Sequence, residues 1–323
     1  MSMKRQLITL ALVALIFALI PVFSNSGSLL NTATMILYLA VMGQAWNILG
    51  GFGGQFSFGH AVFFGTGAYA IGVLQVQFGL NAWVALPLAI GLSALVGAIL
   101  GALSFRYGLK GSYFALVTLA FAEVFRILAN TFQFTGAGVG LQLPLKESFA
   151  EMQFATKGGY LYLILAIMVA AFSCAIWLKH SRYGAWLMAV RDNEDAAQAL
   201  GVDPFTVKLK AIALSGAIMG AGGAFYVQLF RYIDPGLSFG PSVSVEALLV
   251  AIIGGMGSIW GPLIGAIVLD TLGHLTRNLF ENAAGLSLVV YGVVLVLMVT
   301  FAPRGLTGLL QWRGRFGKGR SSK

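Results

Sequence analysis

Long apolar runs separated by short polar stretches make up most of the sequence. A helix that spans a bilayer needs about 20 consecutive apolar residues, and many of these runs reach or approach that length. Residues 56–78 form a weaker, glycine-rich run, whereas 244–273 is too long for one straight crossing and is interrupted by "GGMGSIWGP" at 254–262. Two short helices or a re-entrant hairpin fit this interrupted run better than one helix. Full crossings are expected at 7–23, 29–48, 83–105, 111–130, 160–178, 211–230 and 285–301.

This pattern predicts an all-α, polytopic membrane protein with about 8–10 transmembrane helices, including broken or re-entrant glycine-rich elements. The composition excludes a soluble protein, because 58% of the residues are apolar, only 10% are charged and the mean hydropathy is +0.86. Soluble domains carry about 25% charged residues. The first apolar run follows a basic start, as in a signal peptide, but the many later spans favour an uncleaved first helix. The lone cysteine, Cys174, excludes an intrachain disulfide and is expected to be a buried small hydrophobic residue.

The basic residues predict the orientation, since cytoplasmic loops are enriched in Lys and Arg. With the N-terminus inside, fifteen of the 20 basic residues are cytoplasmic and Arg126 lies within a span. Both termini are then cytoplasmic, the basic tail 303–323 is a solvated end with some attraction to anionic lipid, and the net charge of +9 reflects topology instead of nucleic-acid binding. The external segments are 24–28, 131–159, 231–243 and 274–284, with the four external cations Lys146, Lys157, Arg231 and Arg277.

Two glycine-rich segments are candidates for the translocation pathway. "GGFG" at 50–53 and "GGMG" at 254–257 each lie beside a span boundary, and transporters built from related halves place broken segments around the pathway. Glycine content alone favours the alternative, which is close helix packing. The polar residues beside the first segment favour a functional break. The candidate pathway residues here are Gly51, Gly53, Gly54, Gln55, Ser57, His60, Gly254, Gly255 and Gly257.

A few charged residues fall within or at the edge of spans. Glu123 and Arg126 stand at i, i+3 and are expected to pair on one helix face, either as a structural clamp onto a neighbouring helix or as substrate contacts. Glu246 opens the interrupted run from outside, where it lines the pathway mouth or interacts with a helix dipole. Asp270 and His274 stand at i, i+4 and suggest an interfacial pair. Glu123, Arg126 and Glu246 join the candidate pathway residues.

The loop 179–210 holds the clearest helix signals outside the spans. Asp192 or Asn193 is expected to cap a short helix, Gly201 to end it in a left-handed conformation, and Asp203-Pro204 to start the next helix. Such a loop either lies flat for solubility or transmits motion to the span that follows it. The residues expected to face the membrane part are Leu187, Val190, Ala197 and Leu200, and those expected to face the cytosol are Arg191, Glu194, Asp195 and Gln198.

The stretch "DAAQALG" at 195–201 resembles the D/E-A-A-x-x-x-G loop through which ABC-importer permeases engage their ATPase subunits, although the Ile-x-Leu-Pro ending is replaced by "AIAL" at 211–214. Four longer segments, 47–69, 108–126, 181–203 and 246–266, resemble the branched-chain amino acid ABC-transporter permease family, specifically the Met-rich member of its permease pair. The resemblance runs in order along residues 30–305. It implies that coupling to an ATPase uses Arg191, Glu194, Asp195, Ala196, Ala197 and Gly201.

The same resemblance implies one transmembrane permease domain over 1–323 in a bacterial inner (cytoplasmic) membrane. Its partners would be a second homologous permease, two cytoplasmic ABC ATPase subunits and a periplasmic substrate-binding protein. The expected substrates are Leu, Ile and Val, with urea or short amides as the alternative within the family. ATP would be used by the partner subunits, and this chain would bind no cofactor.

Enzymatic chemistry is not expected from the residues themselves. "GLKGSYF" at 108–114 lacks the G-x-x-x-x-G-K-S/T order of a phosphate-binding loop, the three histidines are too far apart to suggest a metal site, and no nucleophile elbow is present. The sequence therefore predicts no catalytic residue and no metal site. A rival function is a self-sufficient ion-coupled carrier or channel with Glu123, Arg126 and Asp270 as relay groups, but the capped cytoplasmic loop argues against it.

Overall fold

The computed structural model describes residues 2–24, 26–146 and 148–279, together with 289, 292–293, 296 and 305–308. Within this part, six helices are long and apolar enough to cross a membrane. They are α1 (Met3–Phe23), α2 (Gly27–Trp46, which continues as the π-helical turn η1, Asn47–Phe52), α4 (Ala82–Arg106), α5 (Gly111–Thr131), α6 (Lys157–His180) and α9 (Pro204–Phe230). The all-α polytopic prediction and the first six predicted crossings are confirmed. Of the seventh, 285–301, only residues 289, 292–293 and 296 are described, so this crossing stays a prediction.

Three apolar helices are shorter, namely α3 (His60–Val76), α11 (Pro241–Gly254) and α12 (Gly261–Leu279). The 14 residues of α11 extend about 21 Å, which is less than the hydrocarbon thickness of about 30 Å. The interrupted run 244–273 is thus two helices joined by the break 255–260, as predicted. The weak run 56–78 becomes α3, which begins four residues later because 53–59 has no regular structure before His60.

Small helices and one short sheet complete the described part. The loop between α6 and α9 holds α7 (Arg182–Asp192) and α8 (Glu194–Ala199), and α10 (Pro235–Phe239) precedes α11. Strand β1 (Leu141–Gln142) pairs antiparallel with β2 (Tyr232–Ile233), with Leu141 opposite Ile233. Three 3₁₀ turns lie in the long segment between α5 and α6, at η2 (Gln133–Thr135), η3 (Ala137–Val139) and η4 (Phe149–Glu151).

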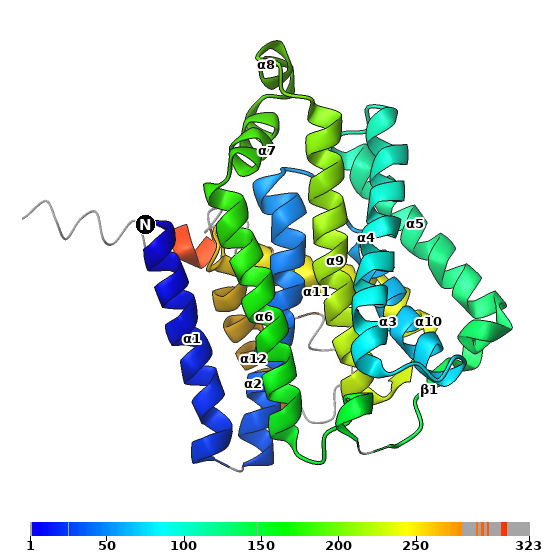
Figure 1. Cartoon of the computed structure of the whole chain (residues 1–323). Helices are drawn as coiled ribbons and strands as arrows, with labels where there is room; N and C mark the ends of the chain where they lie inside the picture. Colours follow the sequence, from blue (N-terminus) through cyan, green and yellow to red (C-terminus); the bar gives the residue numbers. More distant parts are fainter. Residues whose placement is uncertain are drawn as a thin grey trace, which may run out of the picture.

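Helices α2 and α9 form the centre of the bundle, and α1 lies at its edge (Figure 1). Glycines let the central helices approach closely, since a Cβ on Gly67 of α3 would lie 2.2 Å from the Gly220 carbonyl oxygen of α9. Helix α1 is largely exposed, as expected of a helix that faces lipid. Within a membrane the hydrophobic effect does not drive helices together, so close packing through small residues holds these helices in contact.

The two ends of the bundle differ. Helices α7 and α8 project from the end at which α1 starts, whereas the sheet of β1 and β2 lies at the other end (Figure 1). The loop predicted to be cytoplasmic and the segments predicted to be external therefore lie at opposite ends. The side chain of Arg277 and the tail 303–323, apart from 305–308, fall outside the described residues.

Candidate functional site

The loop between α6 and α9, which we call the coupling segment (181–203), is built by local capping. The Asn193 side chain accepts a hydrogen bond from the Ala196 backbone N–H over 3.0 Å and starts α8, so Asn193 is the cap and Asp192 is not. Gly201 has φ of +84°, which suits glycine and ends the segment as predicted. Asp203 caps α9 by accepting from the N–H groups of Phe205 and Thr206 at 3.1 and 3.3 Å. A hydrogen bond from the Thr206 side chain also lowers the pKa of the Asp203 carboxyl.

The inner face of the coupling segment is mostly as predicted. Leu187, Val190 and Ala197 are buried. Leu200 is not, and the prediction that it faces the membrane part is wrong, because its side chain is 86% exposed. Helix α8 ends at Ala199, so Leu200 no longer follows the buried face of that helix.

The exposed tip carries apolar surface as well as charge. Leu200 and the half-exposed Trp186 border a cavity of about 220 Å³ between α7 and the start of α9. Asp195 and Ala196 are also exposed, as is Gln198. An apolar tip with neighbouring polar groups is typical of a surface that another protein covers.

Glu194 does not face the cytosol freely, which corrects the expected orientation. Its two carboxylate oxygens contact the ammonium groups of Lys208 at 2.7 Å and Lys110 at 3.0 Å. The Lys208 side chain is buried and lies over the Phe105 ring, 5.5 Å from the ring centroid. Burial raises the pKa of the Glu194 carboxyl, but the hydrogen bonds from Lys208 and Lys110 outweigh it, so the net pKa is lowered. Glu194 therefore connects α8 to α9 and to the α4–α5 turn.

Arg191 points back from the coupling segment into the bundle. Its Nη1 donates to the Gly51 carbonyl oxygen over 3.1 Å, and its Nε donates to the Asp192 carboxylate over 2.9 Å. Its aliphatic stem covers Gly54, where an added Cβ would lie 2.4 Å from the Arg191 Cγ. Arg191 is exposed in part, but its guanidinium also contacts the first glycine-rich segment, so it does not point only outward as predicted.

The two glycine-rich breaks lie against each other. The Asn47 side chain in η1 donates from Nδ2 to the Ser258 carbonyl over 2.9 Å and accepts at Oδ1 from the Gly257 N–H over 2.8 Å. A Cβ on Gly51 would lie 2.0 Å from Asn47 Oδ1 and 2.5 Å from the Gly257 nitrogen. We call this contact, formed by Asn47, Gly51, Gly54, Gly257 and Arg191, the glycine junction. Sequence reasoning missed Asn47, although a buried amide within an apolar run signals a required polar partner.

The other candidate glycines mainly allow close backbone contact, which agrees with the packing alternative. A Cβ on Gly254 would lie 1.7 Å from the Gly261 carbonyl oxygen across the break. Gly255 and Gly257 have φ of +118° and +71° and turn the chain from α11 into α12. A Cβ on Gly53 would lie 2.7 Å from the Leu49 carbonyl oxygen.

The candidate polar residues Gln55, Ser57 and His60 are buried. His60 Nε2 lies 2.9 Å from Ser215 Oγ, which donates to the Ala45 carbonyl over 2.6 Å and so joins the start of α3 to α9 and α2. The Ser57 carbonyl accepts from the Trp46 indole over 2.9 Å. The Gln55 amide reaches only the Gly53 carbonyl, at 3.4 Å. Ser57 and the Nε2 atom of His60 are thus used in internal hydrogen bonds, whereas His60 Nδ1 has no partner in the described part of the chain.

The start of α11 also meets the start of α3. Ser244 Oγ of α11 accepts from the Ala61 N–H of α3 over 2.8 Å, and both residues are buried. The two shorter helices therefore begin side by side within the bundle. Such discontinuous helices are typical of transporter interiors.

Glu123 and Arg126 form the predicted pair. Arg126 Nε donates to Glu123 Oε2 over 2.9 Å, and the two side chains are 36% and 50% exposed. Among the described residues, the pair stays within α5 and does not fasten α5 to a neighbour.

The other charged candidates lie elsewhere. His274 Nε2 of α12 lies 3.5 Å from the buried Asp270 and 3.3 Å from Thr32 Oγ1 of α2. Helices α5 and α12 are on opposite sides of the bundle (Figure 1). Glu246 on α11 is partly exposed. Within the described part, Glu123, Arg126 and Asp270 therefore form no continuous relay, which the carrier alternative requires.

The chain was also compared with known proteins. The family model described as "Branched-chain amino acid transport system / permease component" matches residues 28–299. The chain is 30% identical to the high-affinity branched-chain amino acid transport system permease protein LivM of Salmonella typhimurium, over 94% of this chain and 75% of the relative. It is 25% identical to the ribose import permease protein RbsC of Escherichia coli, over 93% of this chain and 92% of the relative.

A third relative is the probable branched-chain amino acid transport permease protein LivH of Methanocaldococcus jannaschii. It is 24% identical over 77% of this chain and 81% of its own length. No solved structure matches the chain. The relatives are all transport permeases and not enzymes.

Proposed function

Because the chain belongs to the branched-chain amino acid transport system permease family, we propose that it imports Leu, Ile and Val as the membrane-spanning subunit of a binding-protein-dependent ABC importer. Membership makes it the permease component of an ABC importer. The substrate class is our proposal, supported by the similarity to a LivM protein along nearly the whole chain.

The proposed assembly contains a second homologous permease, two cytoplasmic ATPase subunits and a periplasmic substrate-binding protein in the bacterial inner membrane. ATP is used by the ATPase subunits, and this chain binds no cofactor of its own. The coupling segment and both termini then lie in the cytoplasm, in agreement with the bias of basic residues.

The observation that carries the proposal is the glycine junction. In the proposed cycle, ATP binding closes the ATPase pair against the exposed tip of the coupling segment. The Glu194–Lys208 ion pair transmits the displacement to α9, and Arg191 transmits it to both breaks through Gly51. Alternating access also requires that nucleotide and binding protein have different affinities for the two states.

An exposed ion pair on α5 is evidence for the second permease in the proposed assembly. Glu123 lies about 18 Å along α5 from Gly111, near the middle of the hydrocarbon layer. A half-exposed ion pair at this depth is unfavourable in contact with lipid tails. We therefore place the second permease, and the pathway between the two subunits, against this face of α5.

Reconstitution tests the proposal. The chain, its permease partner, the ATPase subunits and the binding protein are placed in proteoliposomes, and uptake of labelled leucine, ribose and urea is measured with and without internal ATP. We expect ATP-dependent uptake of leucine. Uptake of ribose instead would favour a sugar permease, which the similarity to a ribose permease makes the second candidate. Leucine uptake by the chain alone would contradict the importer proposal.

A further inference from the structure

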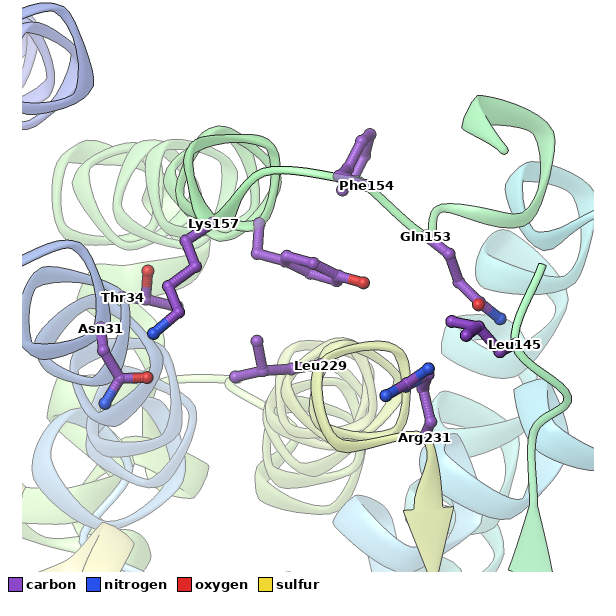
Figure 2. A pocket seen from close by; sticks show the side chains of 9 residues that line it. Asn31, Thr34, Leu145, Gln153, Phe154, Lys157, Leu229 and Arg231 are labelled. Atoms are coloured by element: carbon purple, nitrogen blue, oxygen red, sulfur yellow. The ribbon is translucent and has the colours of Figure 1, made fainter. Parts of the chain in front are cut away.

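A cavity of about 300 Å³ opens at the end of the bundle opposite α7 and α8. It lies among the first turns of α2, the start of α6, the end of α9 and the segment that follows β1 (Figure 2). Its polar lining consists of Asn31, Thr34, Gln153, Lys157, Tyr160 and Arg231, and its apolar lining of Leu145, Phe154 and Leu229.

The cavity is positively charged. Lys157 and Arg231 approach it from two sides, and none of the described residues that line it is acidic (Figure 2). Lys157 Nζ contacts the Gly27 carbonyl oxygen at 3.3 Å, and neither cation forms an ion pair within the described part of the chain. Lys157 is also the first residue of α6, where the helix dipole is unfavourable to a cation. An anion within the cavity would relieve this unbalanced charge.

The wall of the cavity is fixed by hydrogen bonds. The buried Gln153 side chain donates to the Pro144 carbonyl and accepts from the Lys146 N–H, both at 2.9 Å. The Arg231 carbonyl accepts from the Leu143 N–H over 2.8 Å, beside the pairing of β1 with β2. The cavity therefore has a defined shape before any ligand arrives.

We infer that this cavity binds a small carboxylate with a short apolar chain. Lys157 and Arg231, which line the cavity from two sides, attract the carboxylate, and the apolar chain contacts Leu145 and Leu229. An ammonium group gains little here, because the described lining offers it neutral acceptors and two repelling cations. The leucine carboxylate is the ligand that the proposed function supplies, and to that extent the inference rests on the proposed function.

The test measures binding to the complete transporter without nucleotide and without the binding protein. Labelled leucine is competed with 4-methylpentanoate, which lacks the amino group, and with leucinamide, which lacks the carboxylate. We expect 4-methylpentanoate to compete at least as well as leucine and leucinamide not to compete. Lys157→Gln and Arg231→Gln should each weaken binding by roughly tenfold, whereas the exposed external Lys146→Gln should leave it unchanged.

Competition by leucinamide, absence of carboxylate binding, or equal binding in Lys157→Gln and Lys146→Gln would overturn the inference. ATP-driven uptake by the same preparation separates this result from the proposed function. Leucine uptake without charge-dependent binding refutes only the cavity site. Binding of 4-methylpentanoate without leucine uptake refutes only the proposed substrate.

Discussion

The Arg191 guanidinium donates a hydrogen bond to the carbonyl oxygen of Gly51 over 3.1 Å, across 140 positions in the chain. Arg191 lies in the last turn of α7, the first helix of the coupling segment, and Gly51 lies within the π-helical turn that touches the second break at Gly257. One side chain thus joins the coupling segment to the first interrupted membrane element and, through the contact of Gly51 with Gly257, to the second.

Arg191→Ala should uncouple ATP hydrolysis from transport. Loss of a hydrogen bond from a charged donor removes roughly 1.5–3 kcal/mol, and we expect leucine uptake to fall by about tenfold or more while ATP hydrolysis continues. Uptake and phosphate release are measured on the same proteoliposomes. Arg182→Ala, which removes an exposed arginine from the same helix, is the matched control and should transport normally. If the two substitutions had equal effects on uptake, Arg191 would have no specific role in coupling.

Gly54→Ala should be more destabilising than Gly79→Ala. Both glycines have positive φ, +67° and +62°, so both substitutions strain the backbone. At Gly54 an added Cβ would also clash with the Arg191 Cγ, which would lie 2.4 Å from it. At Gly79 no atom lies within 4 Å of an added Cβ. Overpacking should add about 1–3 kcal/mol, measured by thermal unfolding in detergent. Gly54→Ala combined with Arg191→Ala should recover part of this difference, and no recovery would show that the clash is unimportant.

The link from α8 to α9 should weaken at acid pH. The pKa of Glu194 is lowered in the folded protein, so its contribution to stability is present above the ordinary carboxyl pKa of about 4.3 and is lost as the pH falls through the lower folded value. Fluorescence of Trp186 on α7 follows the transition. Glu194→Gln should reduce the acid transition to the part that comes from the Asp203 cap, and Asp195→Asn, at an exposed position of the same helix, should leave it unchanged. A transition equally large in Glu194→Gln and in the unaltered protein would assign it to another group.

Leu200→Ser should affect assembly and not folding. The side chain is exposed, so the free energy of unfolding should change by no more than about 0.5 kcal/mol. Binding of the ATPase subunit, measured by co-purification or titration, should weaken severalfold because the apolar tip is lost. The buried Leu187→Ala provides the contrast and should lower the free energy of unfolding by about 2–5 kcal/mol. Unchanged ATPase binding in Leu200→Ser would show that the ATPase docks on another surface.

Local features were predictable from the sequence, because they depend on neighbouring residues. Six crossings, the interruption after Gly254, a cap at Asp192 or Asn193 and the cap at Asp203 all follow from apolar runs, glycine and capping chemistry, and the structure selects Asn193. Leu200 was misplaced because one residue decides whether a side chain still belongs to a helix face.

Contacts between distant segments were not predictable in the same way. The glycine repeats at 50–53 and 254–257 suggested related roles, but no periodicity indicates that Asn47 bridges them or that Arg191 reaches Gly51. Glu194 was expected to face solvent because its partners lie on other elements, Lys110 far away in the sequence and Lys208 14 positions away on α9, and are brought together only by packing.

The π-helical turn at Asn47–Phe52 has a geometric consequence. A π turn closes its hydrogen bonds over one residue more than an α turn does. Removing that extra residue from the turn shifts the hydrogen-bonding register by one position, which corresponds to a rotation of about 100° and a rise of about 1.5 Å. This segment can therefore move only in steps of one hydrogen-bonding position. An intermediate position would leave buried carbonyl and amide groups without partners. The π-helical turn, which touches the second break, is therefore suited to switching between two discrete positions and not to a continuous movement.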